Sequence, residues 1–122
     1  MWNNNFFLNK KVLITGSTGF KGSWLSIWLD LLGAKIYGIA LDPPTSPSLF
    51  EEANLNNIIK NNIIDIKDTE KVINTIKKIK PDYIFHLAAQ PIVSLSYLKT
   101  VETWNTNVIG TINILESLRL LN

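Results

Sequence analysis

One glycine-rich stretch has the spacing needed to bind a diphosphate: Gly16, Gly19 and Gly22 stand three residues apart. They follow an apolar run rich in β-formers and precede an apolar pattern with helical spacing. In such a strand–loop–helix unit, the first glycine permits a tight turn, the second lets a pyrophosphate approach, and the third lets the helix pack on the sheet. The free N–H groups and the dipole at the helix start favour a phosphate. The alternative is a plain turn with three packing glycines.

Asp42 is the second candidate, 20 residues after Gly22 and at the end of a second expected strand. A carboxylate at this spacing binds the adenosine ribose hydroxyls of NAD. It would repel a 2′-phosphate, and no Lys or Arg lies between Lys35 and Lys60 to offset it, so NAD is favoured over NADP. The alternative is an Asp that opens a turn before Pro43.

Two further strand ends carry candidates. Asp65 and Ile66 end the third expected strand, where an acidic and an apolar side chain can bracket an adenine ring; a strand-end turn is the alternative. The fourth expected strand ends in Leu87, Ala88, Ala89 and Gln90. Small residues in this segment let a cofactor lie flat across the strand ends, or they simply pack under a helix. His86 lies inside an apolar run and is expected to be structural.

The elements that must position these residues alternate between strand and helix. Strands are expected over 11–15, 35–41, 62–66 and 83–89. Helices are expected over 20–32, after a capping box at 48–51, after an N-cap at Asp68, and over 100–121. Continuous apolar strands separated by helices predict an α/β fold: a doubly wound parallel sheet of Rossmann type, of about four strands, with helices on both faces.

Helical spacing also predicts which side chains are buried. In the first helix, Trp24 and Trp28 lie one turn apart, and we expect both indoles in the core. In the last helix, a stripe of apolar positions is expected to be buried: Val101, Trp104, Val108, Ile112, Leu115 and Leu118. Gly33 is expected to end the first helix in a left-handed conformation.

Composition narrows the class of protein. The 122 residues suit one domain, and 46% hydrophobic residues are too many for a disordered chain. A net charge of +2 gives no reason to expect a nucleic acid or a membrane surface as partner. Without Cys and with a single His, neither a disulfide nor a metal site is expected. Because no secretion signal and no apolar run of about 20 residues is visible, we expect a cytoplasmic protein.

Three motifs together resemble the extended short-chain dehydrogenase/reductase family. They are the glycine loop from Thr15 to Gly22, the segment His86-Leu87-Ala88-Ala89, and Asn107-Val108-x-Gly110-Thr111. Two longer stretches, 19–25 and 41–51, together with Ala88-Ala89-Gln90-Pro91, are similar to the CDP-glucose 4,6-dehydratases within that family.

The resemblance implies an NAD-dependent lyase that removes water from a nucleotide sugar, CDP-glucose being the expected substrate, in deoxysugar and polysaccharide biosynthesis. It also implies roles for individual residues. Asp42 would meet the ribose, Asp65 and Ile66 the adenine, and Asn107 would steady the strand ends. The pyrophosphate would be lined by Gly16, Thr18, Gly19, Phe20 and Lys21, ahead of Gly22, and the nicotinamide half by Leu87, Ala88, Ala89 and Gln90.

The same resemblance implies a catalytic Tyr with a Lys four residues later. Tyr37, Tyr83 and Tyr97 have no such Lys, so no residue here is expected to be catalytic. We therefore expect residues 1–122 to be the N-terminal part of an NAD-binding domain, inactive alone, with the remaining strands, the catalytic pair and the substrate domain beyond them. A homodimer through the last helix is expected of the longer protein. Two alternatives stay open: a nucleotide-sugar 4-epimerase of the same family, and a non-catalytic NAD-binding module.

Overall fold

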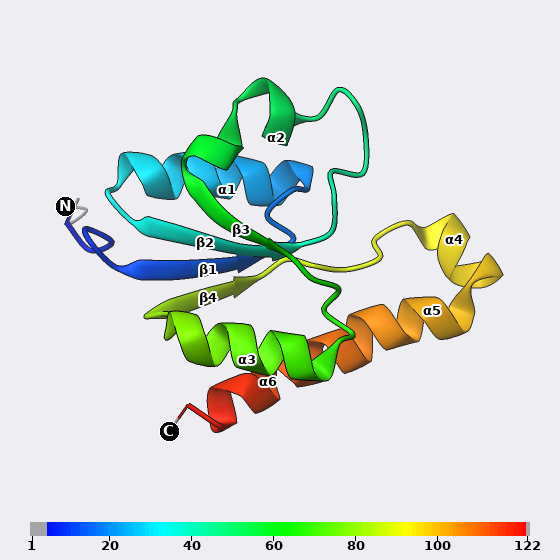
Figure 1. The fold of residues 1–122 in the computed structure, drawn as a ribbon. Helices are drawn as coiled ribbons and strands as arrows, with labels where there is room; N and C mark the ends of the chain where they lie inside the picture. The colour runs from blue at the N-terminus through cyan, green and yellow to red at the C-terminus, as the bar shows by residue number, and fades with distance from the viewer. Residues whose placement is uncertain (1–4, 122) are drawn as a thin grey trace.

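The computed structural model describes residues 5–121, and their strands form a single four-stranded sheet. The strands are β1 (Lys11–Thr15), β2 (Lys35–Ala40), β3 (Ile59–Ile63) and β4 (Tyr83–His86). They lie in the order β3-β2-β1-β4 and every neighbouring pair is parallel (Figure 1). The expected doubly wound sheet is therefore confirmed. The order of the connections reverses between β1 and β4, which is where such sheets open a crevice for ligands.

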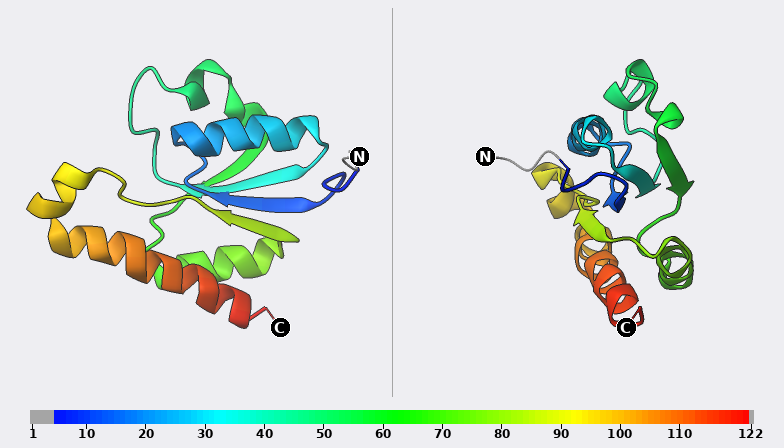
Figure 2. Two further views of the ribbon diagram at one scale, coloured as in Figure 1. Left: turned by 180° about the vertical axis from the view of Figure 1, so that it is seen from behind. Right: turned by 90° about the vertical axis from the view of Figure 1, so that its left-hand side faces the viewer.

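Helices cover both faces of the sheet (Figures 1 and 2). One face carries α1 (Phe20–Leu31), α2 (Leu49–Glu52) and the 3-10 helix η1 (Leu55–Asn57). The other carries α3 (Thr69–Ile79) and α6 (Gly110–Arg119), which pack against each other. The chain from β4 to α6 passes through α4 (Val93–Leu98), α5 (Thr100–Trp104) and the π-helical turn η2 (Asn105–Ile109), which extend beyond the sheet.

The core is divided by the sheet into two clusters because successive strand residues point to opposite faces. On β1, Val12 and Ile14 belong to the cluster under α1 and α2, which also contains Leu29 and Phe50. Leu13 belongs to the cluster under α3 and α6, together with Ile39, Ile66, Val72, Ile76, Ile79 and Ile114. Both clusters hold β1, the strand that leads into the glycine loop, rigidly in the centre.

The expected helix caps are present. Ser48 Oγ accepts a hydrogen bond from the Glu51 N–H at the start of α2, and Asp68 Oδ1 accepts one from the Lys71 N–H at the start of α3. The hydrogen bonds at Ser48 and Asp68 satisfy N–H groups that have no partner inside the helix. Gly33 follows α1 with φ of +78°, the left-handed conformation expected there.

The two tryptophans of α1 lie outside the core, contrary to expectation. Trp24 is 54% exposed and Trp28 57%. The side of α1 that meets the sheet is instead made mostly of small residues: Gly22, Ser23, Ser26 and Leu29. Small side chains let the helix backbone approach the sheet closely, and two indoles could not be accommodated in that space.

The boundaries of three strands also differ from expectation: β2 ends one residue earlier, at Ala40, and β3 and β4 differ more. β3 is formed three residues earlier, and Ile59 is its buried residue whereas Ile63 is 58% exposed. The polar residues between them are tolerated because β3 lies at the edge of the sheet. β4 ends at His86, because the chain turns out of the sheet after the Leu87 N–H bonds to the Thr15 carbonyl (3.2 Å).

The last helix is interrupted and faces the other way from the prediction. The π-helical turn η2 divides it, and the preceding helix α4 was not expected from the sequence. The residues of α6 that are buried are Gly110, Asn113, Ile114 and Ser117. The stripe expected in the core points away from the sheet: Val101, Trp104, Val108, Ile112, Leu115 and Leu118 are all exposed. The reason is again close approach, since a Cβ on Gly110 would lie 2.4 Å from Ile66 Cδ1.

Candidate functional site

The glycine loop joins β1 to α1 at the carboxyl end of the sheet. Gly16 has φ of +73°, and a Cβ on it would lie 2.9 Å from the Ala88 N atom. A Cβ on Gly22 would lie 2.1 Å from the Gly16 carbonyl oxygen, so the helix start is folded tightly against the loop. The local backbone therefore requires the absence of a side chain at both positions.

The start of α1 is open to an anion. Gly19 is the N-cap residue, no side chain of residues 5–121 caps the helix, and its first turn contains no acidic residue. The first N–H groups of a helix have no intrahelical acceptor, and the helix dipole adds a partial positive charge there. Phe20 and Lys21 are exposed beside this turn, and Phe20 makes an edge-on contact with Trp24. The arrangement suits a phosphate or diphosphate group.

The ends of β1 and β2 are held together by the loop. Thr18 Oγ1 donates to the Leu41 carbonyl (2.8 Å), and the Gly16 N–H donates to the Ile39 carbonyl (2.9 Å). These bonds place Asp42, the residue after Leu41, beside the loop. Its carboxylate is exposed and makes no hydrogen bond or ion pair with residues 5–121. Asp42 is thus available to a ligand that lies across the strand ends.

Asp65 and Ile66 lie beyond the end of β3 and not on it. Asp65 Oδ1 accepts from the Lys67 N–H (2.9 Å) and Oδ2 lies 3.5 Å from Lys67 Nζ, as in a turn. The Ile66 side chain is buried against Gly110, and its carbonyl accepts from Asn113 Nδ2 (2.8 Å). Both residues stabilise the turn into α3, and their contact with an adenine stays a prediction.

The segment after β4 is held by an amide from the π-helical turn. Asn107 Oδ1 accepts from the Gln90 N–H (2.8 Å), and Asn107 Nδ2 donates to the Gln90 carbonyl (3.2 Å). The Gln90 side chain folds back, accepting from the Ile92 N–H and donating to Thr103 Oγ1. Leu87, Ala88 and Ala89 therefore lie between two anchored points, the end of β1 and η2.

His86 is bonded at both ring nitrogens: Nδ1 lies 2.7 Å from Thr15 Oγ1, and Nε2 lies 3.0 Å from Thr111 Oγ1. Burial lowers its pKa from the ordinary value of 6.5, because the charged form would lose solvation. The sequence indicated a structural His, but neither threonine was expected to contact it. In the sequence, Thr15 is visible only as a polar residue at the end of an apolar strand. Thr111 is visible only as the last residue of the motif that begins at Asn107.

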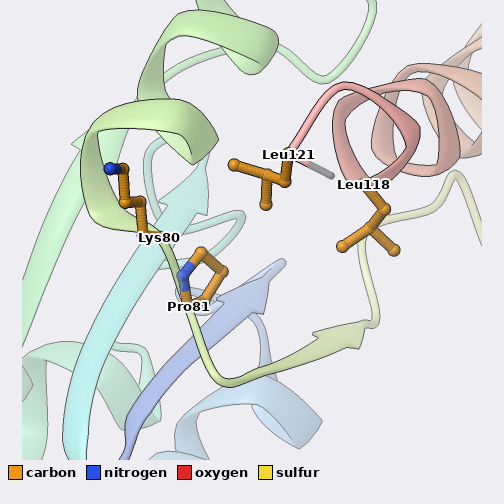
Figure 3. A pocket seen from close by; sticks show the side chains of 4 residues that line it. All are labelled: Lys80, Pro81, Leu118 and Leu121. Atoms are coloured by element: carbon orange, nitrogen blue, oxygen red, sulfur yellow. The ribbon is translucent and has the colours of Figure 1, made fainter.

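The described residues also line two open hollows away from this site. One, of about 400 Å³, lies between the end of α3 and the end of α6 and is lined by Lys80, Pro81, Leu118 and Leu121 (Figure 3). The other, of about 530 Å³, includes Lys11, Tyr37 and Lys60. Neither contains a residue of the glycine loop. Between residues 5 and 121, acidic and histidine side chains form no cluster that could hold a metal ion, and none of the helices could span a bilayer.

Comparison with known proteins gives a family profile and close relatives. The profile of the family described as GDP-mannose 4,6 dehydratase matches residues 13–122. A CDP-glucose 4,6-dehydratase of Salmonella typhimurium is 52% identical over 119 residues, which cover 98% of this chain and 33% of the relative. A GDP-mannose 4,6-dehydratase of Yersinia enterocolitica is 31% identical, with 91% and 32% covered. The chain thus spans about a third of the length of these curated relatives.

A solved structure with the same fold is the UDP-glucose 4-epimerase of Thermus thermophilus in complex with NAD. It superposes with a TM-score of 0.78 at 26% identity, over 91% of this chain and 34% of the other. The fold is therefore shared with a protein whose solved structure contains the dinucleotide.

Proposed function

Because the chain belongs to the GDP-mannose 4,6 dehydratase family of extended short-chain dehydrogenases/reductases, we propose that it is the NAD-binding part of a nucleotide-sugar 4,6-dehydratase. The observation that carries the proposal is the glycine loop. It is folded so tightly that a Cβ on Gly22 would lie 2.1 Å from Gly16 O, and it leads into an uncapped helix start. Such a loop offers backbone N–H groups to a diphosphate.

The remaining candidates would hold the two halves of the dinucleotide. Asp42 would accept hydrogen bonds from the adenosine ribose, since its exposed carboxylate has no partner among residues 5–121. Asp65 and Ile66 would border the adenine, and the segment from Leu87 to Gln90 would support the nicotinamide half. When bound, NAD would supply reversible hydride transfer to and from the sugar. The residues of this chain would bind and orient it.

We propose CDP-glucose as the substrate of the longer protein, which would form the 4-keto-6-deoxy sugar by loss of water. The support is 52% identity to a CDP-glucose 4,6-dehydratase, against 31% to a GDP-mannose 4,6-dehydratase. The similarity to a UDP-glucose 4-epimerase makes an epimerase the second candidate. Product analysis separates the two, because an epimerase would return a sugar without loss of water.

We further propose that the catalytic residues, the remaining strands and the substrate domain belong to the rest of a longer protein. The chain spans about a third of its relatives, and Tyr37, Tyr83 and Tyr97 are not followed by a Lys four residues later. The exposed apolar stripe from Val101 to Leu118 supports a homodimer of that protein. Sedimentation of the longer protein, with Trp104→Glu as the variant, tests the dimer; an unchanged oligomer would reject this surface.

The proposed NAD site is tested by titrating the chain with NAD and NADP while following heat or indole fluorescence. Wild type should bind NAD more tightly than NADP. Asp42→Ala should weaken NAD binding about tenfold or more, the value of a hydrogen bond to a charged group. Asp30→Ala removes an exposed carboxylate near the far end of α1 and should leave binding unchanged. No binding of NAD at millimolar concentration by the folded chain would reject the proposal.

The chain alone should not turn over CDP-glucose in the presence of NAD, and the longer protein should form the 4-keto product. Turnover by residues 1–122 would show that the catalytic groups lie within them.

A further inference from the structure

The hydrogen bond between the Thr15 hydroxyl and His86 has a fixed direction, with the hydroxyl as the donor. Thr15 is fully buried, and its Oγ1 accepts hydrogen bonds from the N–H groups of Leu87 and Ala88, both at 3.1 Å. A hydroxyl has two lone pairs and one proton. The Leu87 N–H is shared with the Thr15 carbonyl (3.2 Å), and among residues 5–121 the ring Nδ1 of His86, 2.7 Å away, is the acceptor left for the hydroxyl proton. Nδ1 is therefore the unprotonated nitrogen.

The hydroxyl of Thr111 orders the other side of the ring. Thr111 Oγ1 lies 2.6 Å from the Asn107 carbonyl, which can only accept, so the hydroxyl proton is donated there. Oγ1 must then accept from His86 Nε2, 3.0 Å away. The two threonines together select the neutral tautomer with the proton on Nε2, because Nε2 must donate to Thr111 and Nδ1 then accepts from the Thr15 hydroxyl.

No charged group among residues 5–121 bonds to the ring of His86. Both direct partners of the ring are uncharged, and burial is the cause that lowers the pKa of His86. The ionisable residues on the neighbouring elements do not bond to it. Lys11 at the start of β1 donates to the Ile79 carbonyl, Tyr83 packs on Phe6 and Phe7, and on α6 Glu116 pairs with Arg119.

This series of hydrogen bonds links β1 to β4, the two strands between which the order of the connections reverses. Thr15 and His86 are direct partners in the β1–β4 register, and Thr15 precedes the glycine loop. Through Thr111 the same series reaches the Asn107 carbonyl in η2, and the Asn107 side chain holds Gln90. The backbone from Leu87 to Ala89 is thus fixed at both ends relative to the loop.

We propose that His86 is a positioning residue of the dinucleotide site. Held between Thr15 and Thr111, it locks β1, β4 and α6 together and sets the backbone of Leu87–Ala89 for the nicotinamide half of the dinucleotide. This role rests on the proposed NAD-binding function. It predicts that loss of the His86–Thr111 bond harms binding of the nicotinamide half and spares the adenosine diphosphate half, which the glycine loop and Asp42 would hold.

The tautomer can be read directly because His86 is the only His of the chain. In a long-range ¹H–¹⁵N spectrum above neutral pH, Nε2 should give a protonated signal and Nδ1 an unprotonated one. A protonated Nδ1, or the averaged signals of an exchanging ring, would overturn the proposal.

Binding separates positioning from general stability. Thr111→Val removes the acceptor of the Nε2 proton, whereas Thr111→Ser retains it. Ser117→Ala is the matched control, because Ser117 Oγ donates to the carbonyl four residues earlier in α6, as Thr111 does, but does not contact His86. We expect Thr111→Val to weaken NAD binding about fivefold while ADP binding stays within about twofold, and both other variants to behave as wild type.

The outcomes distinguish this inference from the proposed function. If wild type binds neither NAD nor ADP, the NAD-binding function is wrong and this role of His86 falls with it. If wild type binds both, then equal weakening of NAD and ADP by Thr111→Val, or no weakening of either, rejects the positioning role and leaves the NAD site intact.

Discussion

Gly22→Ala should damage both the fold and the dinucleotide site, because the new methyl group has no room. Its Cβ would lie 2.1 Å from the Gly16 carbonyl oxygen and 2.9 Å from both the Gly16 carbonyl carbon and Ser17 Cα. All three are backbone atoms, so no side chain can rotate away. Ordinary contacts begin near 3.4 Å, and the loop must therefore move by more than 1 Å.

The expected change in the free energy of unfolding of Gly22→Ala follows from two opposing effects. Overpacking of a tight site costs about 1–3 kcal/mol. Replacing Gly by Ala inside a helix returns up to about 1 kcal/mol of helix propensity. Because the clash is with backbone atoms that cannot rotate away, the upper part of the overpacking range applies, and the free energy of unfolding should fall by about 1–3 kcal/mol. NAD binding should weaken about tenfold or more, because a loop displaced by 1 Å loses at least one or two hydrogen bonds to the diphosphate.

Gly19→Ala is the matched comparison. A Cβ there would meet only the Gly16 carbonyl oxygen, at 3.3 Å, and φ of −77° suits alanine. Stability should change by less than about 1 kcal/mol, the difference between Gly and Ala as N-cap. NAD binding should nevertheless fall, because the methyl group occupies the approach of the pyrophosphate. Urea denaturation and NAD titration of both variants test this. A Gly22→Ala protein as stable as wild type refutes the packing argument. A Gly19→Ala protein that binds NAD normally refutes the proposed binding of the diphosphate by the glycine loop.

Three further predictions concern stability and use urea denaturation. The lowered pKa of His86 means that the unfolded chain takes up the proton first, so stability is complete above about pH 6.5 and falls as the pH drops toward the folded-state pKa. His86→Gln should lose less stability than wild type between about pH 7.5 and pH 5.5, and parallel curves would contradict this. Ile76→Ala empties a fully buried position and should cost about 2–5 kcal/mol, whereas Lys77→Ala, exposed beside it, should cost little. Asn113→Ala should cost about 1–3 kcal/mol, because it leaves the Ile66 carbonyl without its donor; a neutral result would show that water replaces the amide.

The order of elements and the glycine loop could be predicted from the sequence because their causes are local. The turn at Gly16 and the caps at Ser48 and Asp68 each depend on residues within a few positions of one another. Apolar strands separated by amphipathic helices lead to a parallel sheet by general rules of chain connection. The position of Asp42 at a strand end follows from the same reasoning.

The direction in which helices face was predicted wrongly for α1 and α6. The sequence shows a stripe of large apolar residues on each helix, and this pattern predicts that the stripe is buried in the core. In the structure small residues such as Ser26 and Gly110 face inward, while Trp28 and Leu115 face outward. Apolar periodicity identifies a face but does not say against what the face packs.

The strand–glycine loop–helix unit and its place in a doubly wound sheet can be predicted from the amino-acid order alone, since those features depend on neighbouring residues. Two contacts are seen only in the folded chain: Thr15, His86 and Thr111 are joined by hydrogen bonds, and Asn107 holds Gln90. Those partners are up to 71 residues apart. Their meeting depends on the register of β1 with β4 and on the close approach of α6, which are set by the packing of the whole chain and by no local pattern.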